Sequence, residues 1–134
     1  MSRLLHIANQ TGWVCLFAIA TASAVAASEL SLVISFTNER LEFGPGDIVQ
    51  AMPVFPQKNV PAVAFQMSAE KARKFGALTA KHVGEKVNII VCGKVTYSPL
   101  ITTPILSGTG VINSDLSLDG ATNMAIRLKR GTCD

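Results

Sequence analysis

Few side chains of this 134-residue chain have the types and spacing that catalysis requires. A serine, a histidine and a carboxylate can be drawn from Ser98, His82 and Asp115, but no nucleophile-elbow motif surrounds the serine. His82 falls on or beside the apolar stripe of an expected helix, so we expect it to pack or to cap that helix. The pattern favours a protein that is not an enzyme, and a small hydrolase is the alternative.

Metal and cofactor sites have little support in the sequence. Cys92 and Cys133 lack metal-ligand spacing, and beyond residue 26 His82 is the only histidine that could complete a zinc site with them. The run Ser107-Gly108-Thr109-Gly110 invites comparison with a phosphate-binding loop. It is followed by the apolar pair Val111-Ile112 rather than by Lys-Ser/Thr and a helix. We expect a turn there, and no cofactor.

Several strands are expected in the segments that carry or flank these residues. Residues 29–38 alternate loosely between apolar and polar side chains, as a half-buried strand does. Residues 60–67 predict a better strand, in which Val63 and Phe65 face opposite to Ala62 and Ala64. Between them the chain is rich in glycine and proline. A short strand is expected over residues 47–52, and Pro53 and Pro56 limit it to a sheet edge or a strand end.

Two helices and a hairpin complete the pattern. Ser68 to Gly84 and Ser117 to Gly131 each combine a capping serine, an apolar stripe and a terminal glycine. The basic residues around the first stripe are either a docking patch or, as we favour, a solvated face. Residues 86–101 predict a hairpin that turns at Cys92-Gly93. Tight turns imply antiparallel neighbours, so we predict an α+β fold: a two-layer sandwich of a mainly antiparallel sheet with two helices packed on one face, ferredoxin-like in character.

The first 26 residues are typical of a secretory leader. Arg3 is followed by a short apolar core and then by small residues that fit a signal-peptidase site ending at Ala26 or, one residue later, at Ala27. An uncleaved membrane anchor is the alternative, although the apolar run is shorter than the roughly 20 residues that a spanning helix needs. After cleavage, eleven basic side chains face nine acidic ones, a net charge of +2. This charge is too small to indicate nucleic acid or an anionic membrane as the partner.

Export changes the interpretation of the cysteines. Cleavage leaves Cys92 and Cys133 in a compartment where disulfides persist, and an even count favours one bridge over two free thiols. The sequence therefore predicts a leader over residues 1–26, an N-terminal strand and linker over residues 27–46, and one domain over residues 47–134. We expect the mature protein to be periplasmic or secreted, without stable membrane insertion.

From about residue 47 to residue 131 an ordered set of motifs resembles the head subdomain in the first large periplasmic domain of SecD, a membrane subunit that assists Sec-dependent protein translocation. The matching stretches are Asp47-Ile48-Val49-Gln50-Ala51, Val60-Pro61-Ala62-Val63-Ala64-Phe65, Ala72-Arg73-Lys74-Phe75, Lys86-Val87-Asn88-Ile89-Ile90-Val91, Gly93-Lys94-Val95, Ser98-Pro99, Pro104-Ile105 and Gly108-Thr109-Gly110-Val111-Ile112. Here Gly120 stands where a glutamate would complete a capping box with Ser117.

The resemblance implies an α+β unit that contacts polypeptide emerging from the Sec channel, or a Sec-associated partner. The candidate surface consists of apolar residues near strand edges: Met52, Val54, Phe55, Tyr97, Leu100, Ile101 and Ile105. Ordinary packing of these loops onto the sheet is the alternative. A second hypothesis is an envelope structural or regulatory protein that reuses the fold for an unrelated partner.

Overall fold

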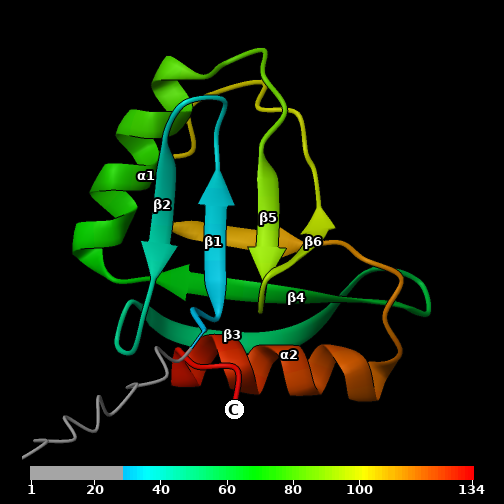
Figure 1. The fold of residues 1–134 in the computed structure, drawn as a ribbon. Helices are drawn as coiled ribbons and strands as arrows, with labels where there is room; N and C mark the ends of the chain where they lie inside the picture. The colour runs from blue at the N-terminus through cyan, green and yellow to red at the C-terminus, as the bar shows by residue number, and fades with distance from the viewer. Residues whose placement is uncertain (1–28) are drawn as a thin grey trace, which may run out of the picture.

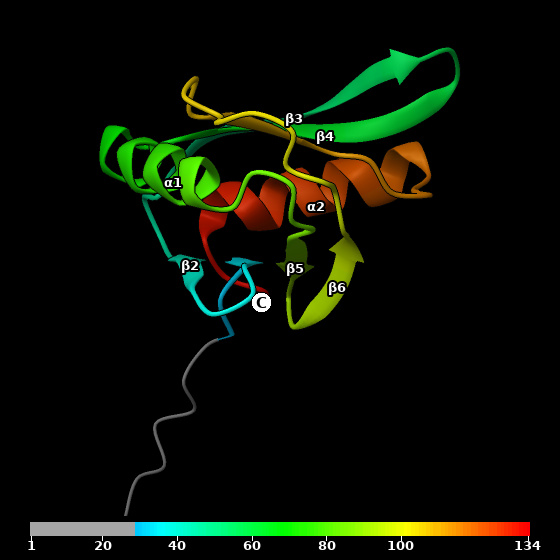
Figure 2. The ribbon, with the colours of Figure 1, turned by 90° about the horizontal axis from the view of Figure 1, so that it is seen from above.

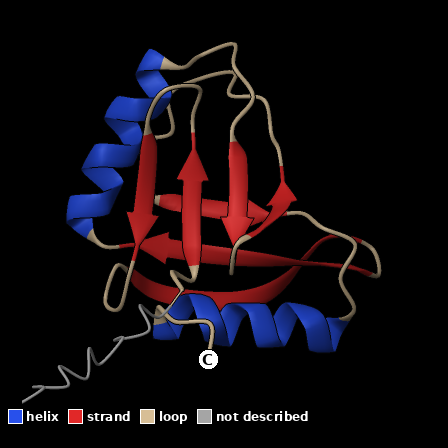
Figure 3. Ribbon diagram, in the orientation of Figure 1, coloured by secondary structure: helices blue, strands red, loops and turns tan. Residues whose placement is uncertain are grey.

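The structure, a computed structural model, describes residues 29–134. In this part of the chain seven strands and two helices follow one another (Figures 1 and 3). They are β1 (Leu32–Ser35), β2 (Arg40–Phe43), β3 (Ile48–Gln57), β4 (Val60–Met67), α1 (Ala69–Lys81), β5 (Asn88–Val91), β6 (Lys94–Tyr97), β7 (Thr109–Ile112) and α2 (Leu118–Arg130). The leader predicted over residues 1–26, with its cleavage at Ala26 or Ala27, lies outside the described residues. Neither described helix is long and apolar enough to cross a membrane.

The first sheet has the strand order β2-β1-β5-β6, and all its neighbouring strands are antiparallel. Leu32 and Ile34 of β1 are fully buried, and Val33 between them is buried as well, so this strand is covered on both faces rather than half-buried as its alternation predicts. β5 and β6 form a hairpin that turns at Cys92-Gly93, where both residues have the positive φ that a tight two-residue turn favours. Residues 29–46, assigned from the sequence to a strand and a linker, thus contribute β1 and β2 to the sheet.

The second sheet has the order β3-β4-β7 and is also antiparallel. β3 is longer than the expected strand, because it continues beyond Met52 through Pro53 and Pro56. Proline has no N–H to offer to a neighbouring strand, which is compatible with the position of β3 at the sheet edge. β7 forms the opposite edge.

Serine caps define the start of both helices. Ser68 accepts a hydrogen bond from the amide of Lys71 in α1, and Ser117 accepts one from the amide of Gly120 in α2. α2 ends at Gly131, whose φ of 79° is the left-handed conformation that favours glycine. One face of α2 packs along β3 and β4, and its buried side chains are Ala121, Ala125 and Leu128.

The α+β class and the antiparallel pairing are confirmed, but the strands form two sheets where the sequence suggested one. The strands of the four-stranded sheet run across those of the three-stranded sheet, and both sheets contribute to one hydrophobic core (Figures 1 and 2). α2 covers one face of the three-stranded sheet, whereas α1 lies at the side of the molecule near β2. The difference arises because alternating side chains identify a strand without identifying its partner.

The two ends of the described domain lie side by side. Leu30 and Thr132 form an isolated antiparallel bridge. One residue further along, Cys133 forms a disulfide with Cys92 of the β5–β6 turn, and the two Cα atoms are 5.6 Å apart. The C-terminal segment is thereby attached both to the start of the domain and to the four-stranded sheet.

Candidate binding surface

One face of the three-stranded sheet carries exposed apolar side chains; we call it the outer face. The strand register places Met52 of β3 beside Ala64 of β4, and Ala64 beside Val111 of β7. Met52 is 42% exposed and Val111 is 44% exposed. A polar row lies next to this apolar row and consists of Gln50, Gln66 and Thr109. Residues of both rows line a shallow hollow of about 270 Å³.

The outer face ends at a strand edge that can accept another strand. Within the described residues β7 pairs with β4 only, and its four residues include no proline. The opposite edge, β3, contains Pro53 and Pro56, which lack backbone donors. An extended polypeptide can add main-chain hydrogen bonds to an open edge such as β7. The free edge and the apolar row therefore form one continuous surface.

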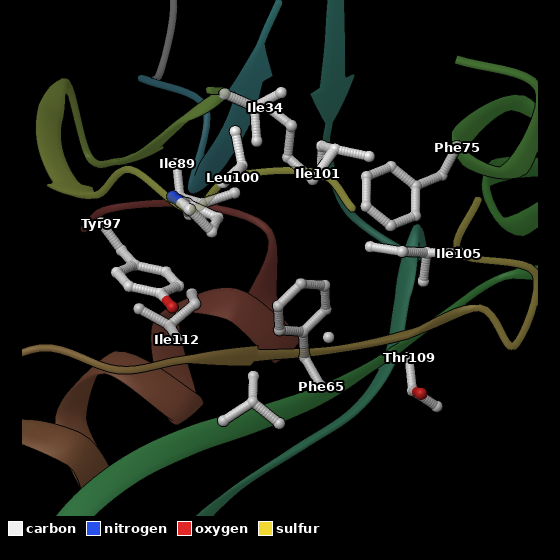
Figure 4. A pocket seen from close by; sticks show the side chains of 14 residues that line it. Ile34, Phe65, Phe75, Ile89, Tyr97, Leu100, Ile101, Ile105, Thr109 and Ile112 are labelled. Atoms are coloured by element: carbon white, nitrogen blue, oxygen red, sulfur yellow. The ribbon is translucent and has the colours of Figure 1, made fainter. Parts of the chain in front are cut away.

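Behind β7, between the two sheets, lies an apolar cavity of about 180 Å³ (Figure 4). Phe65 of β4 and Phe75 of α1 point into it, and the Tyr97 ring lines one side. Further lining side chains come from β1, β5 and β7. Others come from the segment 99–105, and we call this segment the cavity wall. An engineered apolar cavity of about 150 Å³ accepts benzene. The cavity is thus large enough for one apolar side chain.

The cavity wall is attached at both of its ends. At one end the buried hydroxyl of Thr79 in α1 accepts a hydrogen bond of 2.9 Å from the amide of Ile105. At the other end the wall pairs with residues 84–87 through three backbone hydrogen bonds of 2.7, 2.9 and 3.0 Å. The position of the wall therefore depends on α1 and on the segment that follows it.

This following segment begins with a buried histidine held between two carboxylates. His82 Nε2 lies 2.9 Å from Glu39 Oε2, and His82 Nδ1 lies 2.7 Å from Glu85 Oε2. Glu39 comes from the β1–β2 loop, so the contact joins the end of α1 to the four-stranded sheet. The ring also packs on Phe36, with 4.8 Å between the ring centroids. We call His82, Glu39 and Glu85 the histidine clamp.

The carboxylates of the clamp favour the charged form of the ring. The hydrogen bond with Glu39, followed by that with Glu85, raises the pKa of His82, and burial of the ring opposes this effect. In turn, hydrogen bonds from His82 and Lys81 lower the pKa of Glu39. Hydrogen bonds from His82 and the Thr37 hydroxyl lower the pKa of Glu85. While the ring is protonated it donates from both nitrogens and therefore has no free nitrogen to act as a general base.

The other residues considered for chemistry do not gather around His82. Ser98 donates a hydrogen bond to a side chain of β5 rather than to the histidine, and Asp115 is not among the partners of the ring. The hydroxyls of Ser107 and Thr109 lie 2.9 Å apart in a turn that leads directly into β7. In the part of the chain that the structure describes, no three ligating side chains are grouped to hold a metal ion.

The seven residues predicted as a polypeptide-contacting surface fall into two groups. Four line the cavity, namely Tyr97, Leu100, Ile101 and Ile105, and three belong to β3, namely Met52, Val54 and Phe55. Only Met52 of the second group borders the hollow of the outer face. Ile101 is 3% exposed and belongs to the hydrophobic core, so its assignment to the surface is corrected. The wall pairs with residues 84–87, and the Ile101 side chain lines the cavity (Figure 4).

Three important residues of this region were missing from that prediction. Phe65 and Phe75 lie on a strand and a helix that the sequence identifies, and Val111 belongs to the apolar pair after the turn. Their spacing indicates burial or pairing but does not show that two sheets leave a space between them. Only the tertiary arrangement brings them to the cavity and the outer face.

Comparison with known proteins identifies the family of this domain. A family model described as SecDF, P1 head subdomain, matches residues 36–133, which include both helices and all described strands except β1. The chain belongs to this family. The SecDF head model extends further toward the N-terminus than the resemblance read from the sequence and includes β2.

Relatives of this SecDF-family chain include protein translocase subunits SecD. The subunit of Rhodobacter capsulatus is 38% identical over 85 residues, which are 63% of this chain and 15% of the relative. The subunit of Dictyoglomus turgidum is 42% identical over 77 residues, which are 58% of this chain and 19% of the relative. The chain thus spans less than a fifth of the length of these relatives.

Solved SecDF structures have a similar head fold. The crystal structure of SecDF in its super-membrane-facing form matches with a TM-score of 0.61 and 31% identity, over 64% of this chain and 12% of that chain. A structure of the membrane component SecDF that enhances protein export matches with the same TM-score and identity, over 64% of this chain and 39% of that chain. These likenesses support the α+β fold of the SecDF head.

Proposed function

We propose that this chain is a non-enzymatic module of protein export that binds unfolded polypeptide outside the cytoplasmic membrane. Its membership of the SecDF head family supports a role in export. The disulfide between Cys92 and Cys133 and the expected leader suit the periplasm or another oxidising compartment. The small net charge of the chain gives no support to a nucleic-acid partner.

The observation that carries the proposal is the apolar row of the outer face beside the free edge of β7. A polypeptide that has just been exported is extended, and it exposes unpaired backbone groups together with apolar side chains. The β7 edge can bind the backbone groups, and Met52, Ala64 and Val111 can cover the side chains. The adjoining polar row offers amides and a hydroxyl that do not select one sequence.

A binding measurement with matched surface variants tests this proposal. The probe is a permanently unfolded, carboxymethylated model protein carrying a fluorescent label, and the full chain is titrated into it. Val111→Lys should weaken binding at least about fivefold, since covering a half-exposed valine is worth about 1 kcal/mol and a charge would be buried in its place. The control is Ile126→Lys, which changes an apolar residue that is 49% exposed on α2 and adds the same charge.

The comparison of the two variants decides the location of the surface. Selective loss in Val111→Lys supports the outer face. Equal affinities for the two variants and the unmodified chain would show that polypeptide binds elsewhere. Absence of binding by the unmodified chain would favour the second hypothesis, an envelope structural or regulatory protein with an unrelated partner.

A further inference from the structure

The cavity wall and the histidine clamp are mechanically connected. Glu85 binds the His82 ring through its side chain and accepts the amide of Ile101 through its backbone carbonyl at 2.9 Å. The amide of Gly84 donates to the carbonyl of Ile101 at 2.7 Å, and the amide of Val87 donates to the wall at Pro99. The residue that fixes the histidine therefore also fixes the inner end of the wall.

Two further backbone hydrogen bonds, from Gly84 to Ile101 and from Val87 to Pro99, also hold this end of the wall. Gly84, between the histidine and Glu85, has a φ of 88°, which lies in the left-handed region that glycine adopts readily. Leu100, in the middle of the pairing, is 54% exposed. The second firm attachment, Thr79 to Ile105, lies four residues further along the wall. Loss of the contact between Glu85 and the ring would thus loosen one of the attachments near Leu100, while the buried Ile101 stays in the core.

Within residues 29–134, the charged groups around the ring come from three segments. Glu39 lies in the β1–β2 loop, Glu85 follows α1, and Lys81 in the last turn of α1 pairs with the second oxygen of Glu39 at 3.2 Å. The Thr37 hydroxyl donates to the same Glu85 oxygen that the ring contacts. Loss of the ring's charge would leave two carboxylates facing a neutral imidazole, which can donate only one of the two hydrogen bonds.

We propose that the histidine clamp is a pH-operated latch, closed while His82 is protonated and released when the ring loses its proton, and that release widens the partly open inter-sheet cavity for an apolar side chain of a bound polypeptide. The second half of this proposal rests on the proposed function; the latch itself does not. The direction follows from linkage, because the pKa of the ring is raised in the closed state. The protonated ring stabilises the closed state fully at pH values below the ordinary histidine pKa of about 6.5. This stabilisation is lost as the pH rises through the raised pKa.

Two measurements on the full chain test the latch. The first follows the imidazole proton resonances by NMR, with the His82→Gln variant identifying the His82 signal. The second follows amide hydrogen exchange of Gly84, Val87 and Ile101, which donate across the pairing with the wall. After correction for the intrinsic pH dependence of exchange, their protection should fall up to tenfold per pH unit above about pH 6.5 and level off once the ring has titrated.

Matched variants separate the latch from a general loss of stability. In His82→Gln the three amides should exchange rapidly at every pH, without the step. In Glu70→Gln, which removes an exposed ion pair with Lys74 on the same helix, the step should be unchanged. A His82 resonance that titrates at or below its ordinary value would overturn the latch. So would a protection step that persists in His82→Gln or is absent from the unmodified chain.

Binding of the labelled unfolded protein at pH 6 and pH 9 tests the link to function. The proposal predicts tighter binding at pH 9 for the unmodified chain, and pH-independent, tight binding for His82→Gln. Equal binding of the unmodified chain at both pH values, with a normal exchange step, would refute regulation of the cavity. Absence of binding at both pH values would refute the proposed function, while the NMR and exchange results would still decide the latch.

Discussion

The disulfide between Cys92 and Cys133 allows a quantitative prediction of stability. It closes a loop of 41 residues, and the chain-entropy model assigns such a loop about 13 cal/mol/K of lost unfolded-state entropy. At 25 °C this corresponds to about 4 kcal/mol, a large part of the roughly 5–15 kcal/mol typical of a domain. For a domain of this size we expect removal of the bridge to lower the Tm by about 15 °C.

The assay is urea unfolding followed by circular dichroism. Cys15→Ser serves as the background, because it leaves only the two bridged cysteines, and it is compared with the triple variant that also carries Cys92→Ser and Cys133→Ser. The background protein should lose about 4 kcal/mol of unfolding free energy on removal of the bridge or on addition of a reductant. The triple variant should not respond to the reductant.

Two outcomes would refute this reasoning. A difference below about 1 kcal/mol between the background and the triple variant would show that the bridge does not constrain the unfolded chain as the model assumes. A reductant effect of equal size on both proteins would show that the loss has another origin.

Two further substitutions probe the surroundings of the cavity. Thr79→Val should cost about 1–3 kcal/mol, because it leaves the partly buried amide of Ile105 without its acceptor, whereas Thr79→Ser keeps the hydroxyl. An equal loss of unfolding free energy in both variants, measured by urea unfolding, would exclude the hydrogen bond as the cause. Gly110→Ala would place a Cβ 2.5 Å from Phe65 Cζ and should cost about 1–3 kcal/mol of unfolding free energy, because the ring must move. Adding Phe65→Leu should recover part of this loss. A Gly110→Ala variant as stable as the unmodified chain would refute the close packing.

The local elements of the fold could be predicted because their signals are local. Ser68 and Ser117 cap the helices that the sequence assigns to them, and the Cys92-Gly93 turn lies where the hairpin was expected. β2 was missed, since its four residues, Arg40–Phe43, contain only two alternations and lie between segments rich in breakers.

The cavity and the clamp could not be predicted, because they depend on contacts between distant segments. His82 was expected to pack or to cap, but its partner Glu39 is 43 residues away in a loop with no distinguishing pattern. Similarly, Phe65 of β4 and Phe75 of α1 line one cavity because two sheets and a helix share one core, and a side-chain period contains no information on which sheet a strand joins.

The bridge between Leu30 and Thr132 means that the chain enters and leaves the fold at a single point. Such a domain can be inserted into a loop of a host protein, because its two ends are close enough to replace a short stretch of that loop without distorting either fold. The same geometry fixes where the host chain continues, because the two host segments joined to the domain start next to each other.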